Sequence, residues 1–347
     1  GERGPQNTLR GELNRWNVDE ASDTWDTIEW LVKNVAATNG RVGITGVSYP
    51  GWLTLMGIID PHPALKAAVP MYPMVDGWMG DDFYHNGALR QTMFEWIYNM
   101  GTHKESKYKP PFGYHDMYEA YLSAGSADAL ARRYNADQLA TWRKIVDNPS
   151  YNAFWRGQAV QDLLATRELK VATLVVHGLF DQEDNFGGIA AYRTLEAKDT
   201  DNTMVHLAVG PWNHGQSQRE GSSLGPLHWN ADTAHWFREE VLLPFWDRHL
   251  KQQTSADPIP PVVAYDTGTK EWKTYESWPA DGRITRSNLY LRAGGRLSSS
   301  APAGTGHGEF VSDPAKPVPY RVRPVLAMYD TGSTWRQWLV DDQRPFS

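Results

Sequence analysis

The sequence predicts an α/β protein with a mostly parallel sheet, a helical insertion and a β-rich C-terminal part. Helices and apolar strands alternate in the first 82 residues and again beyond residue 167, as in a parallel sheet covered by helices. Between these two parts the pattern is helical, and beyond residue 255 short alternating segments are separated by Gly, Pro and Asp. We therefore expect an α/β core made of 1–82 and 167–254, a helical cap at 83–166 and a β domain at 255–347.

The first part of the core begins with an amphipathic helix at 23–35. Its apolar face consists of Trp25, Ile28, Leu31, Val32 and Val35. Acidic residues near its start suit the helix dipole, and Asn39-Gly40 ends it. A strand, a turn, a second helix and a second strand are expected to follow at 41–45, 46–51, 52–59 and 66–71.

The remaining elements follow from the same kind of pattern. The cap contains helical stretches such as 117–122 and 127–134. The second part of the core is predicted to contain strands at 171–177 and 203–209 and helices at 188–197 and 232–251. A proline-rich linker at 258–261 leads to predicted strands at 262–265, 272–275 and 287–291.

Composition excludes several classes of function. The formal net charge of −7 disfavours a nucleic-acid-binding protein. The absence of cysteine excludes disulfides, thiolate metal sites and cysteine nucleophiles, and no apolar run approaches the length of a membrane span. The chain starts at Gly1 without an initiator methionine and stops at Ser347, so we expect a piece of a longer protein, truncated at both ends.

A serine follows the first predicted strand in a turn rich in glycine, Gly46-Val47-Ser48-Tyr49-Pro50-Gly51. This stretch resembles the nucleophile elbow G-x-S-x-G, which presents a serine hydroxyl on a strained turn between a strand and a helix. The second glycine comes one position late, with Pro50 in its place. By itself the motif is equally compatible with an ordinary strand-to-helix turn.

Two further residues complete a possible catalytic set. Asp181 follows the strand 171–177, and His214 follows the strand 203–209. Ser48, Asp181 and His214 stand in the chain order of α/β-hydrolases, each at the carboxyl end of a predicted strand, where open α/β sheets place their sites. Alternatively, His214 is a structural loop residue and Asp181 caps the helix that follows.

The chemistry of these residue types assigns their roles. Ser48 would be the nucleophile, His214 the base that takes its proton, and Asp181 the group that orients the imidazole. The backbone N–H of Tyr49, the residue after the nucleophile, would donate to the oxyanion.

Acidic residues gather beside this set. Glu183 and Asp184 follow Asp181 closely, and Asp81-Asp82 follows the strand 66–71. Such carboxylates repel one another unless a cation lies among them. They therefore form a solvated helix-capping loop, a metal site or a pocket for an ammonium group. No calcium-loop spacing is present, and an ammonium would position a cationic acyl donor beside Ser48.

The chain resembles the α-amino acid ester hydrolases, relatives of cocaine esterase, glutaryl acylases and X-prolyl dipeptidyl peptidases. The resemblance covers nearly the whole chain. It rests on the segments 16–23, 46–51, 60–66, 73–82, 177–184 and 210–215.

This resemblance implies an α/β-hydrolase domain with a helical cap and a C-terminal jelly roll. It implies an acyl-enzyme on Ser48, His214 as base, Asp181 as its orienting group and Tyr49 as an oxyanion donor. It also implies an ammonium site at Asp82, Glu183 and Asp184, no cofactor and no metal.

The implied substrates are α-amino acid esters and amides, including β-lactam antibiotics, with transfer of the acyl group to water or to a β-lactam amine. The implied protein is a periplasmic or secreted homo-oligomer without nucleic-acid or membrane partners. The family's second oxyanion donor is a tyrosine on an N-terminal segment that this sequence lacks.

Other functions remain open from the sequence. A dipeptidyl peptidase also needs a free amine, whereas the acidic group would repel a glutaryl side chain and offer nothing to a neutral ester. A non-enzymatic binding module is a further alternative, in which the jelly roll would bind the ligand.

Overall fold

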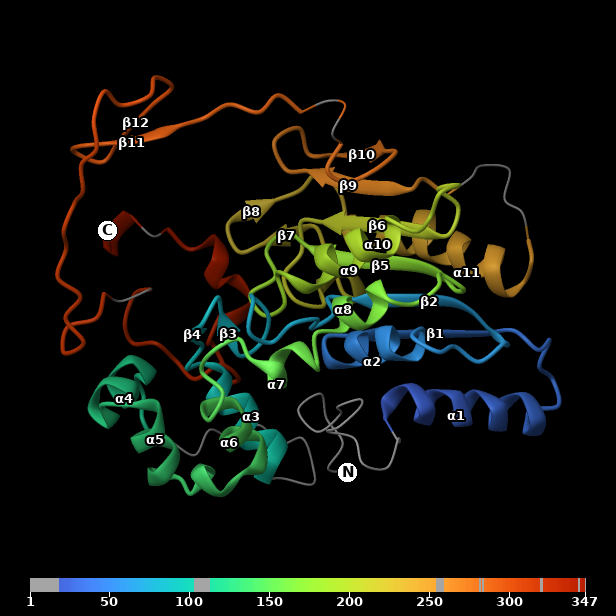
Figure 1. Ribbon diagram of the computed structural model, residues 1–347, viewed down its shortest axis with the longest axis horizontal. Helices are drawn as coiled ribbons and strands as arrows, with labels where there is room; N and C mark the ends of the chain where they lie inside the picture. Colours follow the sequence, from blue (N-terminus) through green and yellow to red (C-terminus); the bar gives the residue numbers. More distant parts are fainter. Residues whose placement is uncertain are drawn as a thin grey trace.

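The computed structural model describes residues 19–102, 113–253, 259–280, 282, 284–318, 321–342 and 344–346. Residues 16–18 of the first resembling segment, and Pro258 of the predicted linker, lie outside these ranges. Six strands form one sheet in the order β1-β2-β5-β6-β9-β10, parallel except for β10 (Figure 1). The strands are β1 (Val42–Val47), β2 (Leu65–Met71), β5 (Ala172–Gly178), β6 (Val205–Gly210), β9 (Val262–Asp266) and β10 (Glu271–Tyr275).

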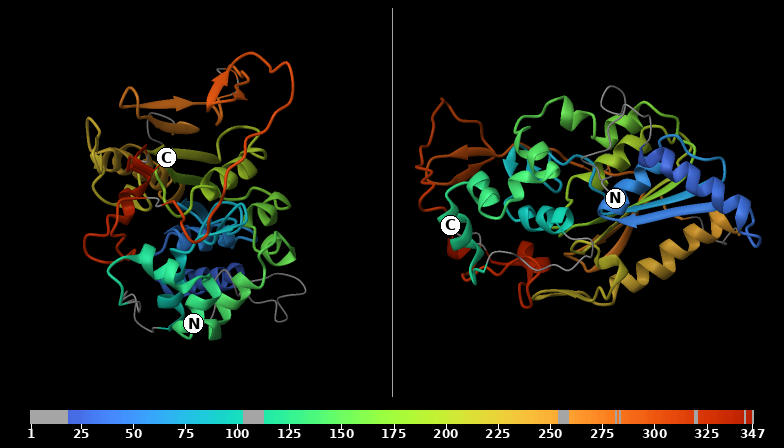
Figure 2. Two further views of the ribbon diagram at one scale, coloured as in Figure 1. Left: turned by 90° about the vertical axis from the view of Figure 1, so that its left-hand side faces the viewer. Right: turned by 90° about the horizontal axis from the view of Figure 1, so that it is seen from below.

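Helices cover both faces of the sheet (Figure 2, right). One face packs against α1 (Glu20–Asn34), α2 (Tyr49–Gly57) and α9 (Gly187–Glu196), with Ile28, Leu55 and Leu195 in a common core. The other face packs against α10 (Thr233–Phe237), a π-helical turn (Arg238–Leu242) and α11 (Leu243–Leu250) through Phe237, Val241 and Phe245. This α/β-hydrolase architecture confirms the predicted fold class.

The predicted helix at 23–35 starts earlier than expected. Asp19 caps α1 by accepting the N–H of Ser22 at 3.0 Å, while the Ser22 hydroxyl accepts the N–H of Asp19. This capping box adds a turn that the apolar pattern does not reveal.

Most of the segment between β2 and β5 forms the cap: residues 93–102 and 117–146 lie beyond one end of the sheet, whereas the last helix of the segment packs against α9 (Figure 1). It begins with a small hairpin of β3 (Tyr84–His85) and β4 (Ala88–Leu89). Its helices are α3 (Met93–Thr102), α4 (Met117–Ala124), α5 (Ala127–Arg133), α6 (Ala140–Val146), α7 (Ala153–Arg156) and α8 (Val160–Ala165). A second small hairpin, β7 (Ser223–Leu224) and β8 (Leu227–His228), follows β6.

The C-terminal part differs from the prediction. We expected 262–265 and 272–275 to belong to a separate β domain starting at 255. Instead, β9 pairs in parallel with β6, β10 pairs with β9, and the central sheet therefore extends to Tyr275. The alternating pattern predicts strands but not their partners, and the burial of Val262 to Tyr265 joins β9 to the core.

Beyond Tyr275 the described residues contain one hairpin, β11 (Tyr290–Arg292) and β12 (Arg296–Ser298). A jelly roll at this end stays a prediction. The chain then returns to the cap, where Met117 donates its N–H to the carbonyl of Val325 at 2.6 Å and Met328 donates its N–H to buried Glu95 at 2.9 Å. Within the described ranges, no helix has the length and apolar character needed to cross a membrane.

Candidate active site

Ser48 occupies the sharp turn between β1 and α2. Its backbone has φ 65° and ψ −125°, a strained conformation for a residue other than glycine. Ser48 donates its N–H to the carbonyl of Met71 at the end of β2, at 3.0 Å, and its side chain does not cap α2. The turn therefore presents the hydroxyl, which makes no capping hydrogen bond to the helix, as a nucleophile elbow requires.

The unusual glycine spacing of this turn has a steric explanation. A Cβ on Gly46 would lie 2.3 Å from the backbone carbon and oxygen of Pro50. A Cβ on Gly51 would lie 2.7 Å from the carbonyl oxygen of Met71. Pro50 itself is exposed in the first turn of α2, where proline is well tolerated. The close approach thus falls at Gly51, one position later than in G-x-S-x-G.

Asp181 and His214 form a hydrogen-bonded pair. Nδ1 of His214 lies 3.0 and 3.1 Å from the two carboxylate oxygens of buried Asp181. Asp181 also accepts the N–H groups of Glu183 at 2.8 Å and Asp184 at 3.0 Å. His214 donates its own N–H to the side-chain oxygen of Gln182 at 3.1 Å. The imidazole is thus held with Nδ1 on the carboxylate and Nε2 available for chemistry.

The pair and the serine share one edge of the sheet. β1, β5 and β6 run in parallel, and Ser48, Asp181 and His214 follow their carboxyl ends. A Cβ on Gly215 would lie 3.4 Å from Cγ1 of Val47, so the histidine loop contacts the strand that carries Ser48.

Tyr72 forms a second link on this edge. It follows Met71, whose carbonyl binds the Ser48 N–H, and its ring centre lies 5.6 Å from that of His214. Its hydroxyl accepts the N–H of Ser217 at 3.0 Å, which anchors the histidine loop.

The electrostatics of the pair favour charge separation. Burial alone would raise the pKa of Asp181, but the charge and hydrogen bond of His214 outweigh it and lower that pKa. Burial alone would lower the pKa of His214, but Asp181, Glu183 and Asp82 outweigh it and raise that pKa to about 9. The carboxylates around His214 therefore favour its protonated form.

Among the clustered carboxylates Asp82, Glu183 and Asp184, the burial of Asp82 and Asp184 is unusual. Asp82 is 3% exposed and Asp184 is fully buried. Both oxygens of Asp184 and one oxygen of Asp82 have no hydrogen-bond partner among the described residues. Burial, followed by neighbouring carboxylates, raises the pKa of each. Native buried carboxylates normally have partners, so this arrangement is compatible with a cationic ligand.

Glu183 connects this acidic group to His214. Its Oε1 accepts hydrogen bonds from Gln182 Nε2 at 3.1 Å and from Trp335 Nε1 at 3.4 Å. Its Oε2 lies 3.8 Å from Nε2 of His214. The structure thus brings the predicted ammonium-binding residues next to the predicted base.

Two residues that hold this loop in place were not assigned from the sequence. Asp81 accepts four backbone N–H groups at 2.7 to 3.1 Å, those of Val75, Asp76, Phe186 and Gly187, and so ties the end of β2 to the start of α9. Arg90 donates to the carbonyl oxygens of Gln182 and Glu183. The sequence shows two adjacent aspartates, Asp81 and Asp82. Only the structure shows that the Asp81 carboxylate is hydrogen-bonded to the backbone, whereas one oxygen of Asp82 has no partner among the described residues.

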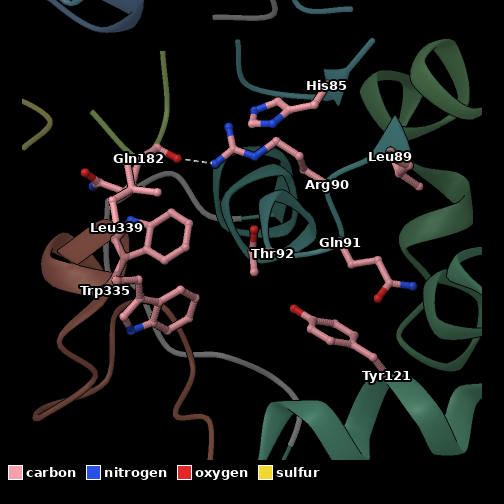
Figure 3. A pocket seen from close by; sticks show the side chains of 10 residues that line it. His85, Leu89, Arg90, Gln91, Thr92, Tyr121, Gln182, Trp335 and Leu339 are labelled. Carbon is pink, nitrogen blue, oxygen red and sulfur yellow. Dashed lines mark hydrogen bonds between the residues drawn. The ribbon is translucent and has the colours of Figure 1, made fainter. Parts of the chain in front are cut away.

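A cavity of about 620 Å³ lies beside this site (Figure 3). Gln182 and Trp335, the two donors to Glu183, belong to its wall. The other lining residues come from the cap and the C-terminal segment: His85, Leu89, Arg90, Gln91, Thr92, Tyr121, Trp338 and Leu339. Its size suits a small organic ligand, and its aromatic walls favour an apolar group.

Tyr49 is the first residue of α2, directly after Ser48. The amino end of a helix stabilises negative charge, so its N–H is suitably placed to stabilise an oxyanion on a Ser48 adduct. As for the alternative of a metal site, the described part of the chain contains no group of three or more histidine or carboxylate side chains arranged to hold a metal ion.

Comparisons with known proteins found a matching family profile and two similar solved structures. The profile of the family described as X-Pro dipeptidyl-peptidase (S15 family) matches residues 5–216. An aminopeptidase from the marine sediment archaeon Thaumarchaeota archaeon is 46% identical, with a TM-score of 0.92 over 98% of this chain and 56% of its own. An α-amino acid ester hydrolase is 42% identical, with a TM-score of 0.91 over 99% of this chain and 57% of its own.

A more distant curated relative is cocaine esterase from Rhodococcus sp. (strain MB1 Bresler). It is 27% identical over 326 residues, which cover 87% of this chain and 55% of the esterase. The chain thus spans just over half the length of each of these relatives.

Proposed function

Because the chain belongs to the X-Pro dipeptidyl-peptidase (S15) family, we propose that its parent protein is a serine hydrolase that cleaves esters and amides of α-amino acids. The observation that carries the substrate class is the pair of buried, unpartnered carboxylates Asp82 and Asp184 beside the Asp181–His214 pair. A substrate with a free α-ammonium group would supply the charge that these carboxylates lack.

The reaction would proceed through an acyl-enzyme. Oγ of Ser48 attacks the carbonyl carbon of the ester or amide, and its proton passes to Nε2 of His214. The N–H of Tyr49 stabilises the tetrahedral oxyanion. His214 then protonates the leaving alcohol or amine, and water releases the amino acid by the reverse sequence.

The cavity would bind the side chain of the acyl group. Gln182 and Trp335 bind Glu183 and also line the cavity, so a ligand whose ammonium reaches Glu183 lies at its edge. Apolar walls with Trp335, Trp338 and Tyr121 favour an aromatic or large aliphatic side chain. Transfer of the acyl group to a β-lactam amine in place of water is part of the same proposal.

An aminopeptidase is the second candidate, favoured by the 46% identical structure of that activity. It would use the same amine site, with an amide in place of the ester. Both candidate activities therefore require the ammonium site, and they differ in the leaving group, which is an alcohol for an ester and an amine for an amide.

The test is steady-state hydrolysis by the full-length protein of phenylglycine methyl ester and its des-amino analogue, phenylacetate methyl ester. We expect kcat/KM to be at least ~30-fold higher for the amine-bearing ester, about 2 kcal/mol of selective binding. Comparable values would leave an esterase without amino acid specificity. Aminoacyl and X-prolyl p-nitroanilides, measured in parallel, would distinguish the peptidase activities.

A further inference from the structure

One contact of the candidate site joins a carboxylate of the predicted ammonium site to the catalytic base. Oε2 of Glu183 lies 3.8 Å from Nε2 of His214, the nitrogen that must accept the Ser48 proton. That nitrogen is buried and has no hydrogen bond to any described residue. The base therefore faces a carboxylate, and its Nε2 makes no hydrogen bond with Ser48.

We propose that an ammonium group bound among Asp82, Glu183 and Asp184 activates the catalytic base: it pairs with the Glu183 carboxylate, and His214 then loses its proton and becomes able to accept that of Ser48. This inference rests on the proposed ammonium site and adds a function to it. The substrate amine would raise kcat as well as lower KM.

The anchoring of Glu183 supports this coupling. Oε1 is fixed by Gln182 and Trp335, so Oε2 remains the oxygen that interacts with either His214 or a ligand. Arg90 donates to the carbonyl of Gln182 (Figure 3) and to that of Glu183 at 2.8 Å. The loop is thus held rigidly, and the charge of the ligand, not a movement of the loop, would make the difference.

The charged and titratable residues around His214 also favour its protonated form. They comprise Asp181 and Glu183 after β5, Asp82 before the β3–β4 hairpin, Tyr72 after β2 and Arg219 on the histidine's own segment, with Asp184 and Arg90 interacting with Asp82 behind them. Asp181 and Glu183 are the charged neighbours that most favour the protonated imidazole, and Arg90 and Arg219 each donate to backbone carbonyls. A cation added here offsets the excess negative charge that keeps the imidazole protonated.

The size of the effect follows from the protonation of His214. With its pKa at about 9, only ~1% of the imidazole is neutral at pH 7. A bound ammonium that returns this pKa to the ordinary value of histidine would leave at least about half of the imidazole neutral at pH 7. The concentration of competent base would then increase ~50-fold.

The amine can be supplied separately from the substrate. Phenylacetate methyl ester has no amine, so its hydrolysis at pH 7 by the full-length protein is measured with methylammonium chloride and with sodium chloride at equal ionic strength. We expect methylammonium to increase kcat ~10- to 50-fold, and the midpoint of the kcat profile to move from near pH 9 towards pH 7. The product is quantified as phenylacetic acid, so that transfer to methylamine is not counted.

Glu183→Gln provides the matched variant, because glutamine keeps the shape and removes the charge. We expect this variant to hydrolyse phenylacetate methyl ester faster than the wild type at pH 7 and to lose activation by methylammonium. Glu168→Gln removes an exposed carboxylate that contacts Lys170 and should behave as the wild type.

The outcomes separate the two proposals. Unchanged or reduced turnover with methylammonium, with an unshifted pH profile, overturns activation by the amine even if phenylglycine methyl ester remains the better substrate. Equal kcat/KM for the two esters overturns the ammonium site itself. The wild-type measurement decides the question on its own if the Glu183 variant does not fold.

Discussion

Asp184→Asn tests the ammonium site most directly. Asp184 is fully buried, and both of its carboxylate oxygens have no hydrogen-bond partner among the described residues. Burial, with Asp82 as the largest of its charged neighbours, raises the pKa of Asp184. Replacing it with asparagine removes a carboxyl group that can ionise beside a bound cation, and almost no volume, so binding and folding should respond in opposite directions.

The expected loss of binding comes from Coulomb's law. An ammonium in contact with a carboxylate, about 4 Å apart at an effective dielectric constant of about 20, gains about 4 kcal/mol. Desolvation and the sharing of the cation with Asp82 and Glu183 reduce this by roughly half, to about 2 kcal/mol. We therefore expect KM for phenylglycine methyl ester to rise ~30-fold and KM for phenylacetate methyl ester to change less than ~3-fold.

The expected gain of stability comes from removing the same carboxyl group. The variant no longer buries an unpaired carboxylate beside others, so the free energy of unfolding should increase by about 0.5–2 kcal/mol. Steady-state kinetics on both esters and thermal unfolding measure the two effects. Equal changes in KM for both esters, or a fall in stability, would refute the assignment of Asp184 to a cation site.

Three further predictions concern the elbow, the glycine contact and pH. Ser48→Ala should lower kcat at least ~10³-fold with unchanged circular dichroism, because the side chain does not cap α2; turnover close to that of the wild type would contradict the nucleophile assignment. Gly46→Ala should destabilise the fold by about 3 kcal/mol or more in chemical denaturation, since its Cβ would lie 2.3 Å from the Pro50 backbone; a neutral effect would mean that the turn relaxes. Because the pKa values of Asp82 and Asp184 are raised above 3.8 and that of His214 is raised above 6.5, these three groups bind more protons in the folded protein than in the unfolded chain, and their contribution to the free energy of unfolding should fall between pH 6 and pH 8. Denaturation at both pH values, with Asp184→Asn as the variant expected to show the smaller fall, checks this sign.

Much of this protein follows from local sequence. The apolar runs at 172–178 and 205–210, the amphipathic helices and the glycines around Ser48 are determined by the backbone near them, so their positions could be predicted to within a few residues. The order Ser48, Asp181, His214 also predicted a shared edge, because parallel strands end on the same side of a sheet. The Asp181–His214 hydrogen bonds at 3.0 and 3.1 Å agree with that prediction.

Other features depend on contacts between distant segments, which periodicity does not encode. The alternating pattern at 262–275 predicted strands, but only their pairing with β6 shows that they extend the central sheet. Asp81 and Asp82 are adjacent and identical in type, yet one accepts four backbone N–H groups and the other keeps an oxygen without a partner. Trp335 reaches Glu183 across 152 residues of sequence. The sequence by itself thus determined which chemical groups are present and which edge of the sheet they share, whereas only the tertiary structure decided which carboxylates are buried without partners and that another carboxylate, Glu183, faces the base.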